Sequence, residues 1–182
     1  MKRWIMLLLS AVLLLVSAGC RAEPETSKQG KNQAPAISVT AEEITIPSTY
    51  GLNQWDGSVY DREDTFLSLM SPVQDIKDLP NIRLHQTIRI ELDGAAPDSY
   101  TLTDQILTKE GKLRYGNAAT QDVPITFSGS HCEFELLPNY AASLSSNVKD
   151  YEPGATIRGF RLTCSWGDNE CEYAFVLRTN AF

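Results

Sequence analysis

Four acidic residues between positions 50 and 64 are the first side chains that could do chemistry: Asp56, Asp61, Glu63 and Asp64. Paired carboxylates can hydrolyse bonds when one of them has a raised pKa. Carboxylate oxygens are also the ligands that calcium prefers, but the order Asp-x-Asp-x-Asp-Gly of a calcium loop is missing here. We therefore predict no metal site and no cofactor, and we keep a carboxylate-based hydrolase as an alternative function.

The same segment carries three aromatic residues, Tyr50, Trp55 and Tyr60. Aromatic rings on loops can form an exposed platform that stacks on a sugar ring or a peptide. They can equally serve as a lid over the core of a β-sandwich. We take Tyr50, Trp55 and Tyr60 as the ligand-binding candidates, with a protein or a carbohydrate as the ligand, and we keep the lid as the alternative.

The two histidines, His85 and His131, predict no catalytic site. His131 stands between Ser130 and Cys132, but neighbours along a strand point to opposite faces, so adjacency in sequence does not make a triad. The sequence contains no glycine-rich phosphate loop and no His-Glu-x-x-His motif. We identify no catalytic residue.

The cysteines Cys164 and Cys171 are the disulfide candidates. A two-residue turn at Gly167-Asp168 would place them opposite each other in a hairpin, at a Cα separation that a disulfide tolerates. The same register makes them a hydrogen-bonded pair, whose side chains diverge. The alternatives are a bridge that involves Cys132, and buried reduced thiols that act as small apolar groups.

The N-terminus has the pattern of an export signal. Lys2 and Arg3 precede a mostly apolar run over residues 4–16, which is short for a membrane span of about 20 residues. Val16-Ser17-Ala18-Gly19-Cys20 then resembles the lipobox of bacterial lipoproteins, with Ser17 where leucine is most usual. The resemblance implies that the signal, residues 1–19, is removed and that the Cys20 thiol carries a diacylglyceryl group. An uncleaved signal anchor and an unlipidated secreted protein are the alternatives.

Residues 20–36 follow as the lipidated cysteine and a flexible tether. The stretch 21–35 has no large apolar side chain, so it cannot bury enough surface to offset the entropy of an ordered chain. From residue 37 to residue 182 there is no second change of composition and no internal repeat. We predict one domain over residues 37–182.

The apolar pattern of this region is that of β-strands. Apolar residues alternate with polar ones at 88–92, 132–136, 160–166 and 171–177, and Pro124 marks the strand at 123–127 as an edge strand. Only residues 62–70 have helical spacing, enough for a single turn. The sequence predicts a mainly β fold, an antiparallel β-sandwich of immunoglobulin-like architecture, with a small β-barrel as the alternative.

The charge balance excludes one class of partner. The chain has 16 basic and 23 acidic residues, a net charge of −7, whereas nucleic-acid binding draws its affinity from basic residues. We predict a lipid-anchored protein of the cell membrane, on the extracytoplasmic face of the cell envelope. Its β-sandwich would be a binding or structural module. An accessory subunit of a membrane sensor or transporter is the alternative beside the hydrolase.

Overall fold

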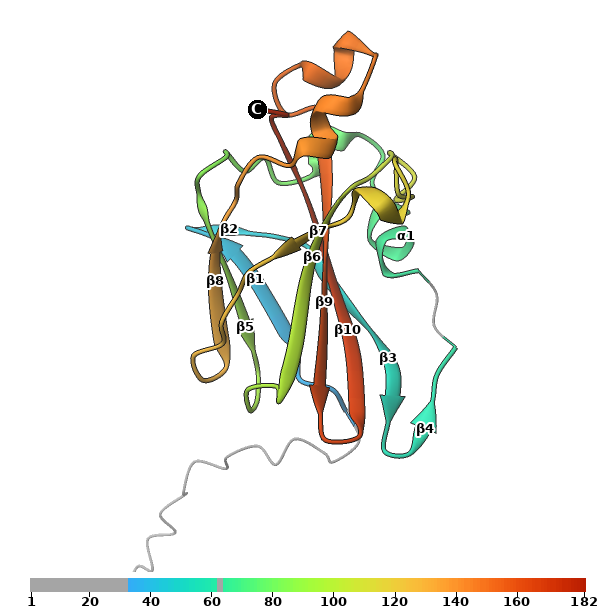
Figure 1. Cartoon of the computed structure of the whole chain (residues 1–182), viewed down its shortest axis with the longest axis vertical. Coiled ribbons are helices and arrows are strands. Elements are labelled where there is room, and N and C mark those ends of the chain that lie inside the picture. The colour runs from blue at the N-terminus through green and yellow to red at the C-terminus, as the bar shows by residue number, and fades with distance from the viewer. Residues whose placement is uncertain (1–32, 62–63) are drawn as a thin grey trace, which may run out of the picture. The chain divides into compact units, whose positions relative to one another are not determined.

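The structure, a computed structural model, describes residues 33–61 and 64–182 as two antiparallel β-sheets that pack face to face (Figure 1). The smaller sheet has the order β2 (Ile44–Thr45), β1 (Ile37–Ala41), β5 (Thr87–Leu92) and β8 (His131–Glu135). The larger sheet has the order β4 (Ser58–Val59), β3 (Ser48–Trp55), β10 (Asn169–Thr179), β9 (Thr156–Trp166), β6 (Ser99–Ile106) and β7 (Gln121–Val123). The helical elements are α1 (Thr65–Met70), η1 (Ile76–Asp78), η2 (Asn117–Ala119), η3 (Tyr140–Leu144) and η4 (Val148–Tyr151).

The predicted β-sandwich is confirmed, and the barrel alternative is wrong because each sheet keeps its own edge strands. One sheet holds β5 and β8, and the other holds β6 and the β9–β10 hairpin. Immunoglobulin-type sandwiches divide strands B and E from strands C, F and G in the same way. Strands β7 and β8 lie at the edges of the two sheets, and Pro124 ends β7 because proline has no N–H for a ladder.

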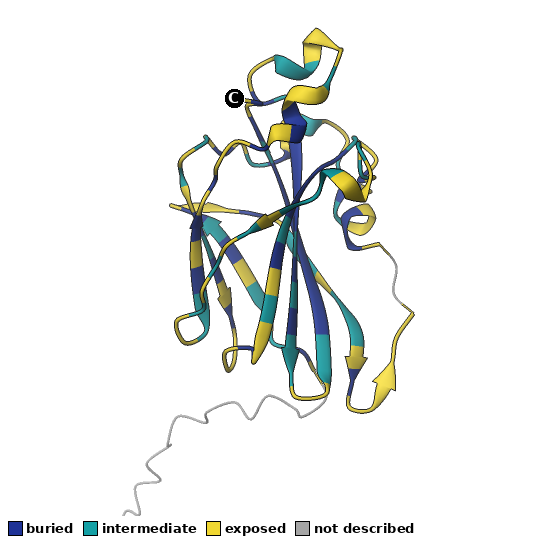
Figure 2. Cartoon of the chain, in the orientation of Figure 1, coloured by how far each residue is buried: buried dark blue, intermediate teal, exposed yellow. Residues whose placement is uncertain are grey.

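The core is built on the β9–β10 hairpin, whose predicted register is confirmed. Phe160 lies opposite Phe175, and their rings stack with centroids 4.9 Å apart. Phe134 of the other sheet packs on Phe160 at 5.5 Å, which joins the two layers. Figure 2 shows buried residues along most of both hairpin strands. At the turn, Gly167 has a φ of 57°, a conformation that glycine adopts at little cost.

Helix α1 covers part of the outer face of the larger sheet. Asp64 begins the helix by accepting a hydrogen bond from the backbone N–H of Phe66, 3.0 Å away. The Thr65 hydroxyl donates to Oε1 of Glu172 on β10 at 2.8 Å. The Arg161 guanidinium lies over the Phe66 ring, 4.8 Å from its centroid. The predicted single turn of helix is therefore present and is fixed to the sheet.

The disulfide predicted between Cys164 and Cys171 is not found in the part of the chain that the structure describes. The two residues are opposite each other, as expected, but the Cys171 Sγ is directed to the carbonyl oxygen of Gly51 on β3, 3.5 Å away. Burial raises the pKa of Cys132 to about 12 and raises that of Cys164 further. These two thiols are therefore protonated at neutral pH and act as small apolar groups of the core.

The predicted signal peptide and Cys20 lie outside the described residues. The described end of the predicted tether, residues 33–36, packs on the sandwich: Ala34 is buried, and the carbonyl oxygen of Pro35 accepts a hydrogen bond from the Tyr173 hydroxyl at 2.8 Å. Among the described helices, none has the length and hydrophobicity needed to cross a membrane.

Gly159 allows the first test of the fold. A Cβ at this position would lie 2.6 Å from Cδ1 of Leu107 and 2.8 Å from Cε1 of Phe66. We expect Gly159→Ala to lower the free energy of unfolding by about 1–3 kcal/mol, because overpacking forces the neighbours to move. Urea denaturation measures this loss. In a Phe66→Leu background the loss should shrink, and an equal loss in both backgrounds would mean that the Phe66 contact is not the cause.

Candidate functional site

The three aromatic candidates do not form one exposed platform. The Trp55 side chain is 6 % exposed and packs edge-on against Trp166, with centroids 5.9 Å apart. Tyr50 and Tyr60 are 40 % and 44 % exposed. The β3–β4 hairpin turns the Trp55 ring toward the core. There it covers the core as a lid, which was the alternative to a binding platform. A platform that includes Trp55 is therefore not formed.

Two acidic residues of the same segment serve local structure, Asp64 through its carboxylate and Asp56 through its backbone. Asp64 begins α1, and Asp56 occupies the β3–β4 turn with a φ of 49°. The backbone N–H of Asp56 donates to the Asn169 side chain at 2.8 Å. Glu63 lies outside the described residues. Within the described ranges, no group of three or more His, Cys, Asp and Glu side chains could hold a metal ion.

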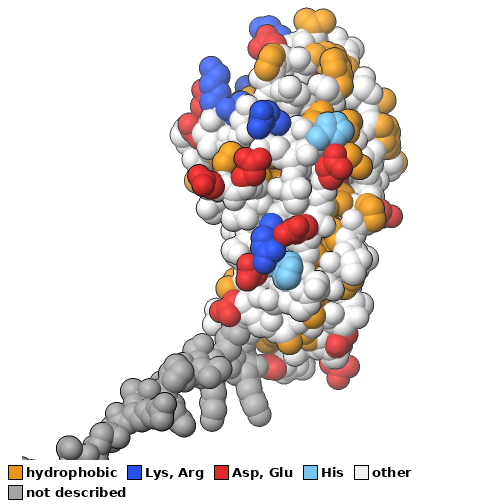
Figure 3. Space-filling model, turned by 90° about the vertical axis from the view of Figure 1, so that its left-hand side faces the viewer, with side chains coloured by type: hydrophobic (Ala, Val, Ile, Leu, Met, Phe, Trp, Pro, Cys, Tyr) orange, Lys and Arg blue, Asp and Glu red, His pale blue; other side chains and the backbone are white. Residues whose placement is uncertain are grey.

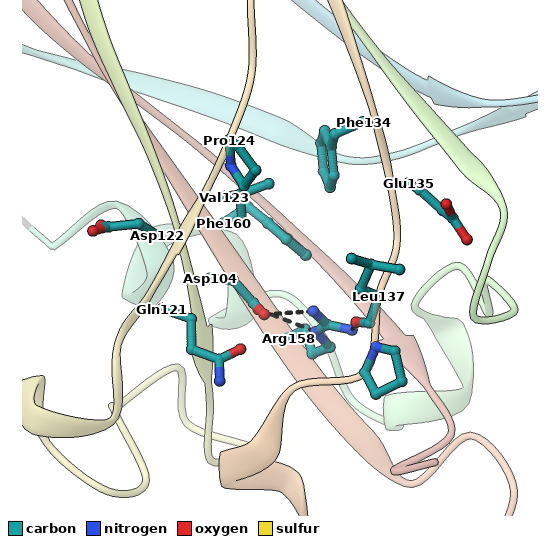
Figure 4. A pocket seen from close by; sticks show the side chains of 11 residues that line it. Asp104, Gln121, Asp122, Val123, Pro124, Phe134, Glu135, Leu137, Arg158 and Phe160 are labelled. Atoms are coloured by element: carbon teal, nitrogen blue, oxygen red, sulfur yellow. Dashed lines mark hydrogen bonds and ion pairs between the residues drawn. The ribbon is translucent and has the colours of Figure 1, made fainter.

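An apolar cleft opens instead between the edges of the two sheets, where β7 and β8 end (Figure 4). Its volume is about 350 Å³. Val123 and Pro124 line one flank, Leu137 lines the other, and Phe134 and Phe160 line the interior. The remaining lining residues are Asp104, Gln121, Asp122, Glu135, Pro138 and Arg158.

The floor of the cleft is an almost fully buried ion pair between Arg158 of β9 and Asp104 of β6. The Arg158 Nε donates to Asp104 Oδ1 at 3.0 Å, and Nη2 donates to Oδ2. The Arg158 Nη1 donates to the carbonyl oxygen of Leu137 at 2.7 Å, and Asn139 Nδ2 donates to Asp104 Oδ2 at 2.6 Å. Each guanidinium nitrogen and both carboxylate oxygens are therefore bonded. The floor is polar and carries no net charge.

This network also positions the rim of the cleft. The chain leaves β8 through Leu137 and Pro138, and the bond from Arg158 fixes Leu137 to β9. Asn139 donates to Asp104 with its amide nitrogen and begins η3 by accepting from the Ala141 N–H at 2.9 Å with its amide oxygen. The network of Arg158 and Asp104, both on the larger sheet, therefore fixes the position of the segment that follows β8 and forms one wall of the cleft.

The outer rim of the cleft carries acidic side chains, and two of them pair with basic side chains. On the outer face of β8, Glu133 Oε1 lies 2.8 Å from Arg89 Nη1, and Glu135 Oε1 lies 2.6 Å from His85 Nδ1. Asp122 adds a third, exposed carboxylate on the β7 side. Figure 3, which views this side of the protein, shows both histidines beside acidic side chains.

Sequence reasoning missed the two residues of the floor. Arg158 is in phase with the inward residues Phe160 and Leu162, and Asp104 is in phase with Leu102. The available signal for these residues was a charged side chain at a strand position where the alternation predicts an apolar one. Which carboxylate faced which guanidinium was not readable, because the partners are 54 residues apart.

Comparisons with known proteins found no matching family model, no matching curated protein and no matching solved structure.

The ion pair on the floor gives the second test. We expect Arg158→Met or Asp104→Leu alone to lower the free energy of unfolding by about 3–5 kcal/mol, because each leaves a buried charge without its partner. The double variant should recover most of that loss. Guanidinium denaturation measures all three variants. Arg89→Met is the control, since its ion pair with Glu133 is solvent-exposed and contributes little. A double variant as unstable as the summed single variants would contradict the pairing.

Proposed function

We propose that the protein is a lipid-anchored binding module of the cell envelope, and that it binds its ligand in the apolar cleft between β7 and β8. The cleft carries this proposal because it combines an apolar lining with a few fixed polar groups, which is the usual composition of a binding site. Its volume lies in the range of about 300–1,000 Å³ that such sites have.

The exposure of the cleft residues supports the same function. Leu137 is 52 % exposed at the mouth, and Pro124 on the opposite flank of the cleft is also exposed. Apolar side chains that meet at the opening of a cleft are typical of surfaces that receive a partner. The accessory-subunit alternative uses the same cleft, with a membrane protein as the partner. The hydrolase has no comparable support, since Asp56 and Asp64 serve a turn and a helix end.

N-acetylphenylalaninamide, which carries one apolar ring between two peptide groups, is a suitable probe of the cleft. At millimolar concentration it should shift the methyl resonances of Val123 and Leu137 in NMR spectra of the full-length chain. The methyl groups of Val59 should not shift, because Val59 lies at the β3–β4 hairpin and outside the cleft lining. We expect the probe to bind because its apolar ring is transferred from water into an apolar site.

Two matched variants control this experiment. Leu137→Asp places a charge at the mouth and should abolish the shifts of Val123. Leu144→Asp makes the same change at a residue of similar exposure, 55 % against 52 %, that does not line the cleft. It should leave the shifts in place. If Val123 does not respond to the probe in the unmodified chain, the cleft is not a binding site.

The anchor is tested at Cys20. Metabolic labelling with palmitate should label the full-length protein and should not label Cys20→Ser. The unmodified protein should sediment with membranes, because two or more acyl chains give stable attachment whereas one gives only marginal binding. Label that persists in Cys20→Ser would contradict acylation at this residue.

A further inference from the structure

We infer that the ligand of the cleft is an extended peptide segment of a partner protein, with alternating basic and apolar side chains, which adds a strand to the free edge of β8. This inference rests on the proposed function and names the class of ligand. Addition of a strand to an exposed sheet edge combines backbone hydrogen bonds with pockets for every second side chain.

The hydrogen bonds between β8 and β5 determine which backbone groups of β8 point to its free edge. The N–H of Leu92 donates to the carbonyl oxygen of Ser130 at 2.8 Å, and the N–H of Leu136 donates to Gln86 at 2.9 Å. In an antiparallel pair, hydrogen-bonded and non-hydrogen-bonded residues alternate. With the observed register, Cys132 and Phe134 therefore bond to β5, and the odd-numbered residues direct their backbone groups to the other side.

Two residues of β8 are available to a new strand. His131 is already used, since its N–H and carbonyl oxygen both pair with Ser128. The N–H and carbonyl groups of Glu133 and Glu135 make no hydrogen bond to another described residue. The two groups of Glu135 stand at the cleft, which Phe134 and Glu135 line, and the two groups of Glu133 lie on the same edge of β8 just before it.

The cleft would accept the apolar side chains of the added strand. In the new pair, the residues directly opposite Glu133 and Glu135 exchange hydrogen bonds with them, and their side chains share the outer face. The residue opposite Phe134 points inward. Its side chain would enter the cleft between Phe134 and Val123, above the floor formed by Arg158 and Asp104.

The outer residues of the added strand would meet an excess of negative charge. Glu133, Glu135 and Glu91 lie on the outer face of β5 and β8, with Arg89 as the single fixed positive charge among these paired side chains. Asp122 stands on the opposite rim. Opposite charges directly across an antiparallel pair are favourable, so lysine or arginine is expected opposite Glu133 and Glu135.

The same features disfavour two other occupants. A second copy that paired its own β8 edge would bring the Glu133 and Glu135 side chains of both chains together, which is destabilising. Residues 21–35 of this chain have no large apolar side chain to enter the cleft. A basic segment of a partner protein has neither disadvantage.

The probe for this inference is an acetylated and amidated peptide of sequence Lys-Val-Lys-Phe-Lys-Val-Lys, titrated into the full-length chain by calorimetry. Methylation of the lysine backbone nitrogens removes the N–H groups that would face β8, and should weaken binding at least about tenfold. Methylation of the valine and phenylalanine nitrogens instead is the control and should have little effect, because those N–H groups face away. Glutamate in place of lysine should also weaken binding about tenfold.

A pair of protein variants tests the edge of β8 directly. Glu133→Pro removes an N–H that takes no part in the β5 ladder, so the strand should still form. Glu133→Ala removes the same side-chain charge but keeps the N–H. Strand addition predicts weaker peptide binding to Glu133→Pro than to Glu133→Ala. A peptide with Glu in place of Lys should not restore binding to either variant.

The outcomes separate this inference from the proposed function. If the lysine-methylated peptide binds like the parent, strand addition is wrong, and a loss of binding in Leu137→Asp would still support the cleft as a binding site. If the parent peptide does not bind while N-acetylphenylalaninamide still shifts Val123, the peptide class is wrong and the binding function stands. A dimer in light scattering that Glu133→Pro abolishes would overturn the inference in favour of a second copy.

Discussion

The buried ion pair between Arg158 and Asp104 is the interaction on which the cleft depends. Buried ion pairs often add little net stability, because removing both charges from water costs as much as their attraction returns. Here the pair instead fixes the positions of the chain segments around the cleft. It joins β6 to β9 and holds the segment after β8 through Leu137 and Asn139. Two apolar side chains in its place could collapse on each other and close the space between the sheets.

The cleft and the core are continuous. Phe134 and Phe160 line the cleft and also join the two sheets, and Phe160 stacks on Phe175 in the centre of the sandwich. A ligand that packs on these rings would therefore extend the hydrophobic core. Binding at this place would couple to the stability of the whole domain, since a ligand that binds only the folded state stabilises it by mass action.

Local patterns in the sequence predicted the fold well, and the site poorly. The hairpin of β9 and β10 was readable because its apolar residues alternate in phase around a short turn. The edge strand predicted at 123–127 is instead β7 at Gln121–Val123, which ends before Pro124. The Cys164 and Cys171 register was right, but register fixes only the backbone separation and not the direction of each thiol. Trp55 could be a platform or a lid, and its burial depends on Trp166, which is distant in sequence. The cleft joins residues from four separate parts of the chain, which no spacing rule connects.

The hydrogen bond between Tyr173 and Pro35 fixes where the described N-terminal segment joins the sandwich. The chain joins the sandwich beside Tyr173, near the β9–β10 turn, whereas Arg158 lies toward the other end of β9. Leu162, the residue opposite Tyr173, lies four positions after Arg158, which is about 13 Å along the strand. The floor of the cleft and the point where residues 33–36 join the sandwich therefore lie at different levels along the same pair of strands.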